Sequence, residues 1–232
     1  MPVVKPRRKQ AEVTRARILA AAAERFAELG FPAARLADVG EAVGVGRSAV
    51  LYHFTDKRQL YRAVLDDLFG GLLVELRSAL TAAGTLAERL EAAVGAFVGY
   101  MGRHPAAARI AVRESVNADP ELRAEIQRQA GPFLALLEST FEEGERTGAF
   151  RSVRSDPLHF ASSIAGATLF YVAALPTLVA RLPYDPLSRD QLEAHERDLI
   201  AITRRLLGIR GPKAVPAGRD DRPGHPREGK SP

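Results

Sequence analysis

The stretch GFPAARLADVGEAVGVGRSAVLYHFTDKRQL, which spans residues 30–60, carries the pattern that decides the fold. Its apolar spacing predicts a short helix over about Leu36–Val43 and a second one over about Arg47–His53, separated by a turn at Gly44. A basic residue, Lys57, opens a third helix. This order of elements is typical of a helix-turn-helix, in which the second short helix enters the major groove of DNA.

The second short helix has one apolar and one outward face. Val50 and Phe54 are expected to be buried, and the outward residues are Arg47, Ser48, Ala49, Tyr52 and His53. The small residues at its start allow the backbone to approach base edges. Arg47 can donate two hydrogen bonds to guanine O6 and N7, which is the commonest specific contact to a base.

This stretch is open to two other interpretations. Residues 44–49 fit the dinucleotide-binding pattern G-x-G-x-x-G/A, but that pattern is meaningful only after a β-strand, and the preceding residues have helical spacing. A purely structural helical hairpin is the other alternative. The sequence favours the DNA-reading interpretation over both.

The residues before residue 30 extend this interpretation. A helix is predicted over about Val13–Leu29, closed by Gly30, and its apolar stripe consists of Ile18, Ala22, Phe26 and Leu29. Upstream, an unstructured basic arm is expected over residues 1–11, with Lys5, Arg7, Arg8 and Lys9. Such an arm either reaches DNA phosphates and the minor groove or is simply a solvated terminus.

These residues resemble the N-terminal domain of the TetR (tetracycline repressor) family. The resemblance covers roughly residues 12–65, through the motifs Thr14–Leu19, Val39–Val45, Tyr52–Phe54 and Lys57. It implies an all-helical homodimer that binds a palindromic operator and releases it when a small molecule enters a second domain. It also implies phosphate contacts from Thr14, His53 and Lys57, and base or backbone contacts from Arg47, Ser48, Ala49 and Tyr52.

Three positions depart from the family pattern. The family usually has alanine at Gly40, serine or threonine at Gly46, and tyrosine at Leu51. Gly40 costs about 1 kcal/mol of helix propensity. Gly46 is an acceptable N-cap without a side-chain oxygen. Leu51 matters most, because it removes a hydroxyl that would bond a DNA phosphate.

Composition is consistent with a DNA-binding protein of one or two domains. The 232 residues are 46% hydrophobic and contain no cysteine, which excludes disulfides and thiolate metal sites. Residues 1–58 carry 11 Lys or Arg against 6 Asp or Glu, whereas residues 59–208 carry 16 against 19. Basic charge therefore lies with the helix-turn-helix. No apolar run follows the basic start, so no secretory signal is expected and the location is expected to be cytoplasmic.

The remainder of the chain reads as successive helices, so the fold class is all-α. We expect a DNA-binding domain over 12–58, a domain for effector binding and dimerisation over 59–208, and a disordered Pro- and Gly-rich tail over 209–232. Helices are predicted over about 56–83, 85–103, 105–116, 119–129, 132–146, 157–180 and 187–207.

The most apolar stretch, Phe160 to Ala180, has 21 residues without a charge. That length could cross a bilayer, but its Ser and Thr residues and Pro176 favour burial, with Pro176 kinking or ending the helix. Helices 157–180 and 187–207 are expected to form the dimer interface, because symmetric dimers are the commonest soluble oligomers. The alternative is packing of both helices within one chain.

An effector pocket is expected among the large side chains of the second domain. The candidates are Phe97, Tyr100, Met101, His104, Phe133, Leu137, Phe141, Phe160 and Tyr171. Apolar residues at helical spacing also occur in ordinary cores. His104 and His159 lack partners at metal-binding spacing, so neither a metal nor another cofactor is expected.

The function predicted from the sequence is a repressor that binds operator DNA as a homodimer and is released by a small, hydrophobic effector. An activator, or a DNA-binding protein without an effector, is the first alternative. An enzyme that uses the apolar pocket is the second, but no catalytic constellation stands out. No membrane partner is expected.

Overall fold

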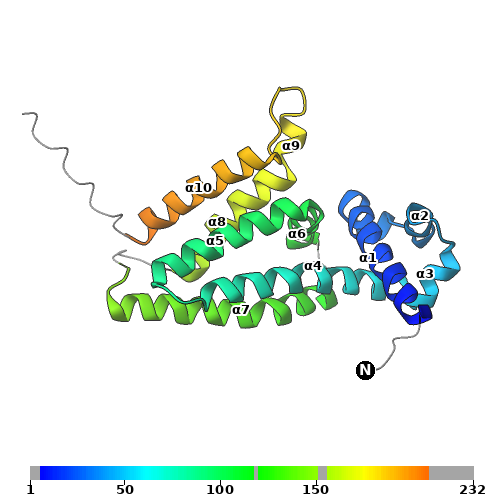
Figure 1. The fold of residues 1–232 in the computed structure, drawn as a ribbon, viewed down its shortest axis with the longest axis horizontal. Coiled ribbons are helices and arrows are strands. Elements are labelled where there is room, and N and C mark those ends of the chain that lie inside the picture. The colour runs from blue at the N-terminus through cyan, green and yellow to red at the C-terminus, as the bar shows by residue number, and fades with distance from the viewer. Residues whose placement is uncertain (1–5, 118–119, 151–155, 209–232) are drawn as a thin grey trace, which may run out of the picture.

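The computed structural model describes residues 6–117, 120–150 and 156–208, and every regular element within these ranges is a helix (Figure 1). The predicted all-α class is therefore confirmed. The helices are α1 (Pro6–Ala33), α2 (Leu36–Ala42), α3 (Arg47–His53), α4 (Lys57–Leu80), α5 (Leu86–Arg103), α6 (Pro105–Asn117), α7 (Pro120–Thr147), α8 (Pro157–Ala173), α9 (Leu175–Leu178) and α10 (Arg189–Leu206).

Helices α1 to α3 form a small head at one end of the molecule (Figure 1). Its core includes the residues that the helical spacing predicted: Ile18, Ala22, Phe26, Val39, Val50 and Phe54 are all buried. Leu29 is the exception, because it is 44% exposed in the last turn before Gly30. The head therefore has its own apolar centre, which holds α3 at a fixed angle on α1 and α2.

Helix α1 begins earlier than predicted. It starts at Pro6, so residues 6–11 are helical and the expected arm over residues 1–11 is wrong for them. Proline is well accepted at a first helical position, and the Arg, Lys, Gln, Ala and Glu residues that follow all favour helix. Residues 1–5, including Lys5, lie outside the described residues. Near the other end, α1 is interrupted at Gly30, where the predicted closure occurs at φ 75°.

Two prolines in the predicted helical segments, Pro132 and Pro176, have different effects in the structure. Residues 119–129 and 132–146 were predicted as two helices, but α7 runs through Pro132. Because Pro132 is exposed, water can reach the carbonyl that loses its donor there. In contrast, Pro176 does end the apolar helix as predicted: α8 stops at Ala173, and α9 is a single short turn that contains Pro176.

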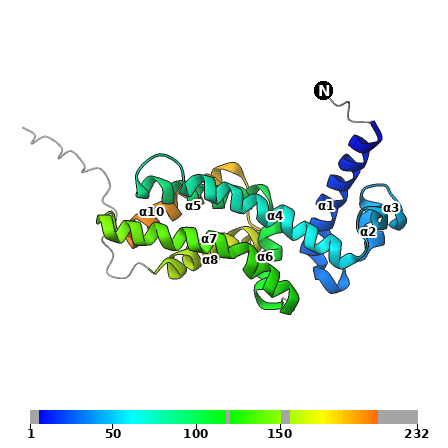
Figure 2. The same cartoon turned by 90° about the horizontal axis from the view of Figure 1, so that it is seen from below.

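The other helices form a larger body, and α4 runs from the head into it beside α5 and α7 (Figure 2). Leu60, Val64, Leu68, Leu72 and Leu76 of α4 are all buried along its length. Helices α8 and α10 lie side by side and are joined through α9 (Figure 1). None of the described helices is both long and apolar enough to span a membrane. The predicted tail, residues 209–232, lies outside the described residues.

Candidate nucleic-acid interface and ligand cavity

The turn between α2 and α3 depends on two glycines. Gly44 has φ 75°, a conformation that L side chains rarely adopt. Gly40 lies so close to the turn that an added Cβ would be 2.7 Å from the Val45 carbonyl oxygen. The Val45 N–H donates to the Gly40 carbonyl at 2.8 Å. The departure from alanine at residue 40 therefore has a steric reason: it lets the turn close tightly against α2.

Helix α3 has the predicted bounds, Arg47–His53, and the predicted buried side, Val50 and Phe54. Its opposite side is open to solvent: Arg47 and Ser48 are exposed, and Tyr52 is 83% exposed. Ala49 and His53 are half-buried, and the His53 ring meets the Tyr52 ring edge-on at 5.2 Å. Among the described residues, the Arg47 guanidinium has no hydrogen-bond or ion-pair partner.

The structure gives Lys57 and Thr14 local roles in the head. The Lys57 ammonium donates to the Pro32 carbonyl at 3.0 Å and lies 4.7 Å from the centre of the Phe31 ring, and partial burial lowers its pKa. The Thr14 hydroxyl donates to the Gln10 carbonyl within α1 at 3.0 Å. Lys57 still has donors available for a phosphate, because an ammonium has three.

Helix α6 links the head to the body. The Arg109 guanidinium pairs with Glu24 of α1 at 2.8 Å, and Arg113 donates to the Ala27 and Glu28 carbonyls of α1. The buried carboxylate of Glu114 accepts a hydrogen bond from Tyr61 of α4. A displacement of α6 or α4 must therefore be felt by α1.

The body contains an apolar cavity of about 250 Å³ between α4, α5, α7 and α8. Every side chain that lines it is apolar. One part of the lining is buried and contains Leu80, Leu90 and Leu137. Another part is half-buried and contains Phe69 and Ile126. The cavity can accept an apolar group, and a polar group attached to it would have to remain toward solvent.

Four of the nine predicted pocket residues line this cavity: Phe97, Phe133, Leu137 and Phe160. The other five do not, namely Tyr100, Met101, His104, Phe141 and Tyr171. Tyr100 donates to the Leu68 carbonyl, and Met101 is 1% exposed in the core. The Phe141 ring packs between Phe150 and Phe160, so it supports the cavity from behind.

Sequence reasoning missed the wall that α4 contributes. Phe69, Leu72, Leu73, Leu76 and Leu80 line the cavity, together with small residues such as Ala93 and Ala161. The spacing of the α4 leucines indicates a buried face in either case, so it does not distinguish a cavity wall from a packed core. The available signal was the set of small residues, Ala93, Ala130, Ala161 and Ala165, which leave room between large ones.

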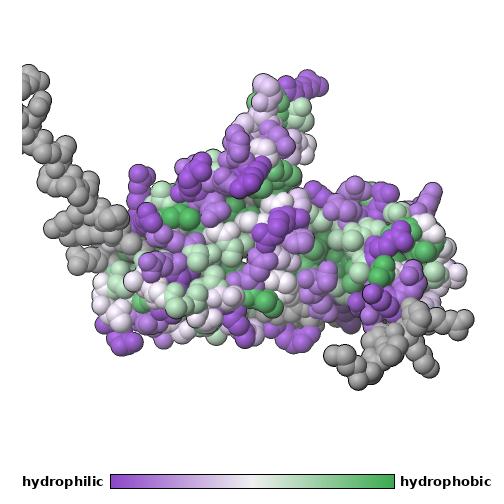
Figure 3. Space-filling model, viewed as in Figure 1, coloured by the Kyte–Doolittle hydropathy of each residue, from purple (hydrophilic) through white to green (hydrophobic). Residues whose placement is uncertain are grey.

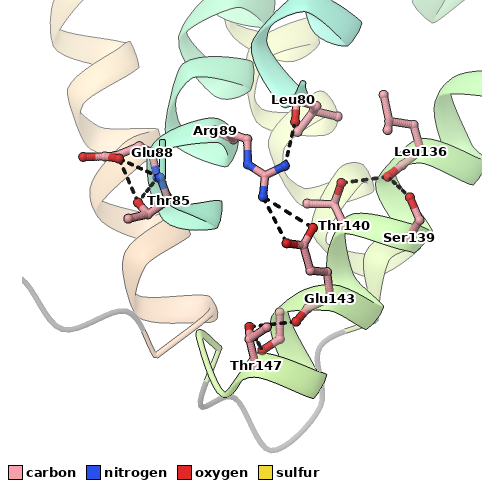
Figure 4. A network of polar contacts seen from close by, with 10 residues as sticks. Leu80, Thr85, Glu88, Arg89, Leu136, Ser139, Thr140, Glu143 and Thr147 are labelled. Carbon is pink, nitrogen blue, oxygen red and sulfur yellow. Dashed lines mark hydrogen bonds and ion pairs between the residues drawn. The ribbon is translucent and has the colours of Figure 1, made fainter. Parts of the chain in front are cut away.

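A polar network fastens α5 to α7 beside the buried part of the cavity (Figure 4). The Arg89 guanidinium donates to both Glu143 carboxylate oxygens and to the Leu80 carbonyl, each at 3.4 Å. Thr85 and Glu88 form a capping box that fixes the start of α5, and these bonds lower the Glu88 pKa. The network holds the ends of three helices together around that part of the cavity.

His104 and His159 are not grouped with other metal-binding side chains. His104 follows the end of α5, with its ring 4.4 Å from that of Tyr100, and His159 is exposed in the first turn of α8. The described part of the chain contains no group of three His, Cys, Asp or Glu residues that could hold a metal ion.

Tyr171 belongs to a separate cluster between α8 and α10. Its ring stacks on the His195 ring at 4.0 Å, and its hydroxyl shares a 2.8 Å hydrogen bond with that of Tyr184. Burial and this hydrogen bond raise the pKa of Tyr171. Burial lowers the pKa of His195 below its usual value of 6.5, although the nearby Asp198 acts in the opposite direction.

The lowered His195 pKa predicts a pH dependence of stability. As pH falls below about 6.5, His195 gains a proton in the unfolded chain before it does so in the fold. Above that pH His195 is neutral in both states and does not change the free energy of unfolding. Below it, the free energy of unfolding falls progressively. We expect His195→Gln to remove this part of the slope in urea unfolding measured from pH 5 to 8. Parallel curves for the two proteins would contradict it.

Two family models match the chain. The model of "Bacterial regulatory proteins, tetR family" matches residues 18–64, and the model of "Tetracyclin repressor-like, C-terminal domain" matches residues 87–202. The first covers α2 and α3 with most of α1, and the second includes α6, α7 and α8. The second match by itself covers half of the chain.

Individual proteins are similar over different lengths. The transcriptional activator FasR of Mycolicibacterium smegmatis is 29% identical over 113 residues, so the match spans about half of each chain, 49% of this one and 52% of FasR. A tetR-family regulatory protein from Rhodococcus RHA1 has the same fold, with a TM-score of 0.67, 23% identity, and 85% of this chain and 98% of that one covered.

FadR of Bacillus subtilis, solved in complex with stearoyl-CoA, also shares the fold, with a TM-score of 0.61 at 18% identity over 80% of this chain and 97% of its own. The fold agrees with these solved structures along both the head and the body, and the two family models together match residues in both parts. The chain therefore belongs to the TetR family of bacterial regulatory proteins.

Proposed function

We propose that the protein is a transcriptional regulator that binds a palindromic operator as a homodimer and is released from it by a small hydrophobic effector. The observation that carries the DNA-binding part is the exposed side of α3. Arg47, Ser48 and Tyr52 face solvent next to a close turn, and the Arg47 guanidinium has no partner among the described residues. Such a side is suited to the major groove.

The proposed homodimer joins through α8 and α10. Helix α8 contains no Lys, Arg, Asp or Glu, yet only one side of it is covered: Phe160, Ile164 and Val172 are buried, whereas Phe170 is 55% exposed. On α10, Ile202 and Leu206 are about two-fifths exposed one helical turn apart, at 42% and 40%. Hydrophilic residues cover most of the visible face of the molecule, and hydrophobic ones emerge in separate patches, some of them over α10 (Figure 3). Two copies that meet on these helices would cover this apolar surface.

The proposed effector carries an apolar group that enters the cavity. The lining offers no hydrogen-bonding side chain, so a polar group of the effector stays outside, near the half-buried Phe69 and Ile126. The volume of about 250 Å³ lies just below the range of about 300–1,000 Å³ typical of small-molecule sites. FadR, which shares the fold, was solved with stearoyl-CoA. An acyl thioester is therefore the first effector class to test, with short chains favoured by the volume.

The proposed coupling between effector and DNA runs through α4. This helix lines the cavity between Phe69 and Leu80, and it bonds α6 through Tyr61 nearer its start. A ligand that fits the cavity only when α4 is displaced would favour a head position that no longer matches the operator. The ligand must bind the two positions with different affinity, or no shift occurs.

The DNA-reading role of α3 predicts the behaviour of Arg47→Ala. Loss of a bidentate contact to one base pair should cost about 1–3 kcal/mol and relax the preference at that position. The operator can be selected from a pool of random duplexes, and binding measured by fluorescence anisotropy. Arg181→Ala, which removes an exposed cation from the loop before α10, is the matched control and should bind like the wild type. An unchanged base preference in Arg47→Ala would contradict the assignment.

Activation of transcription is the specific alternative to repression. FasR, which matches over half of this chain, is named an activator. A reporter gene placed behind the selected operator distinguishes the two: expression of the protein should lower reporter output if it is a repressor, and raise it if it is an activator.

A further inference from the structure

A groove of about 630 Å³ lies beside α3, between the turn from α1 to α2 and the turn from α3 to α4. Three cationic side chains line it, namely Arg35, Arg47 and Lys57, against one carboxylate, Asp56. The Asp56 carboxylate already accepts a hydrogen bond from the Gln59 N–H at 2.7 Å, as the cap of α4. The groove therefore has an excess of positive charge.

Arg35 is placed where the local structure gains nothing from it. It is the N-cap residue of α2, yet its side chain makes no capping bond, and its cation lies at the positive end of the helix. The side chain is exposed and, like that of Arg47, has no partner among the described residues. A residue that opposes local helix stability is expected where function requires it.

Leu51 forms part of the same groove. The family resemblance implies a tyrosine hydroxyl at this position that would bond a DNA phosphate, and leucine cannot supply that bond. Arg35 lines the groove from the opposite turn and has several free donors.

We propose that this groove binds a backbone phosphate of the DNA that α3 reads, and that Arg35 provides the contact that Leu51 cannot make. The groove adjoins the exposed side of α3, so the backbone of a duplex engaged by Arg47 passes beside it. A guanidinium is well suited to phosphate oxygens, because its donors form a planar fork. The inference depends on the proposed DNA-binding function.

The test measures binding of a labelled random-sequence duplex by anisotropy, for wild type and Arg35→Ala, between about 50 and 200 mM salt. Each phosphate contact adds about 0.9 to the slope of log affinity against log salt. Arg35→Ala should therefore lower the slope by about 0.9 and weaken binding about eight-fold at ~0.1 M salt. Arg77→Ala, which removes an exposed cation from the body portion of α4, should leave both unchanged.

Two further variants separate a contact from a structural effect. Arg35→Lys should keep most of the slope, because it keeps the charge. Arg35→Gln should lose it while its thermal midpoint is at least that of the wild type, because a cation is removed from the positive end of α2. Leu51→Tyr added to Arg35→Ala should recover part of the lost slope. A wild-type slope in both Arg35→Ala and Arg35→Gln overturns this proposal alone. A wild-type protein that binds no duplex even at ~50 mM salt overturns the proposed function and this inference with it.

Discussion

Phe170→Glu is expected to convert the proposed homodimer to a monomer and to weaken operator binding about 10²- to 10⁴-fold. The proposed interface contains two copies of α8 around a two-fold axis, so two glutamates would enter one apolar surface. Burial of unpaired carboxylates is costly, and α8 contains no Lys or Arg that could pair with them. Once the dimer separates, the second α3 is no longer held at its half-site, and the gain from joining two binding modules is lost.

Sedimentation velocity measures the mass, and anisotropy with the selected operator measures the affinity. Val74→Glu is the matched control, because Val74 is a 70% exposed apolar residue on α4, and the same substitution there should leave both values unchanged. A dimeric Phe170→Glu protein with wild-type affinity would exclude α8 from the interface.

Ala93→Phe is expected to abolish the response to effector while DNA binding is retained. Ala93 is 8% exposed and lines the cavity, so a phenyl ring there would occupy space that a ligand needs. The added volume costs about 1–3 kcal/mol if the surrounding side chains cannot adjust, less if the ring fills the empty space. Ligand affinity should fall at least about 100-fold, because the two groups exclude each other.

The measurement uses isovaleryl-CoA and stearoyl-CoA as probes of short and long chains. Binding of a ligand at 100 times its dissociation constant stabilises the fold by about 2.7 kcal/mol, which is visible as a rise in the thermal midpoint. Ala92→Phe is the control, since Ala92 is the exposed neighbour on the same helix and should respond like the wild type. An equal rise in Ala93→Phe would place the ligand outside this cavity.

The head was the part most accessible to prediction from sequence. The bounds of α3 follow from local signals on both sides, Gly44 and Gly46 before it and the buried Phe54 after it. The start of α1 was missed because the basic residues near Pro6 suggested a solvated arm, although each of them favours helix. Charge alone does not decide between an arm and a helix.

The cavity was less predictable because it is a property of packing in three dimensions. Phe97 and Phe160 line the cavity, whereas Tyr100 and Tyr171, which were predicted with them as large side chains, contact other parts of the body. Leu72 and Leu76 are buried on one face of α4, yet nothing in their helical spacing shows that the space opposite them is unfilled. The space is unfilled because alanines on α5, α7 and α8, which are distant in sequence, supply too little side-chain volume there.

The continuity of α4 from the head to the cavity wall also limits how such proteins can be recombined. A chimaera that joins this head to another body must be spliced within a helix, and its junction must preserve the count of residues. One residue added between Leu65 and Phe69 would rotate the head by about 100° and shift it by about 1.5 Å along the helix axis relative to the cavity. Exchange of heads among relatives is therefore governed by helical phase. A chimaera joined at non-equivalent positions of α4 would hold its α3 helices in the wrong orientation.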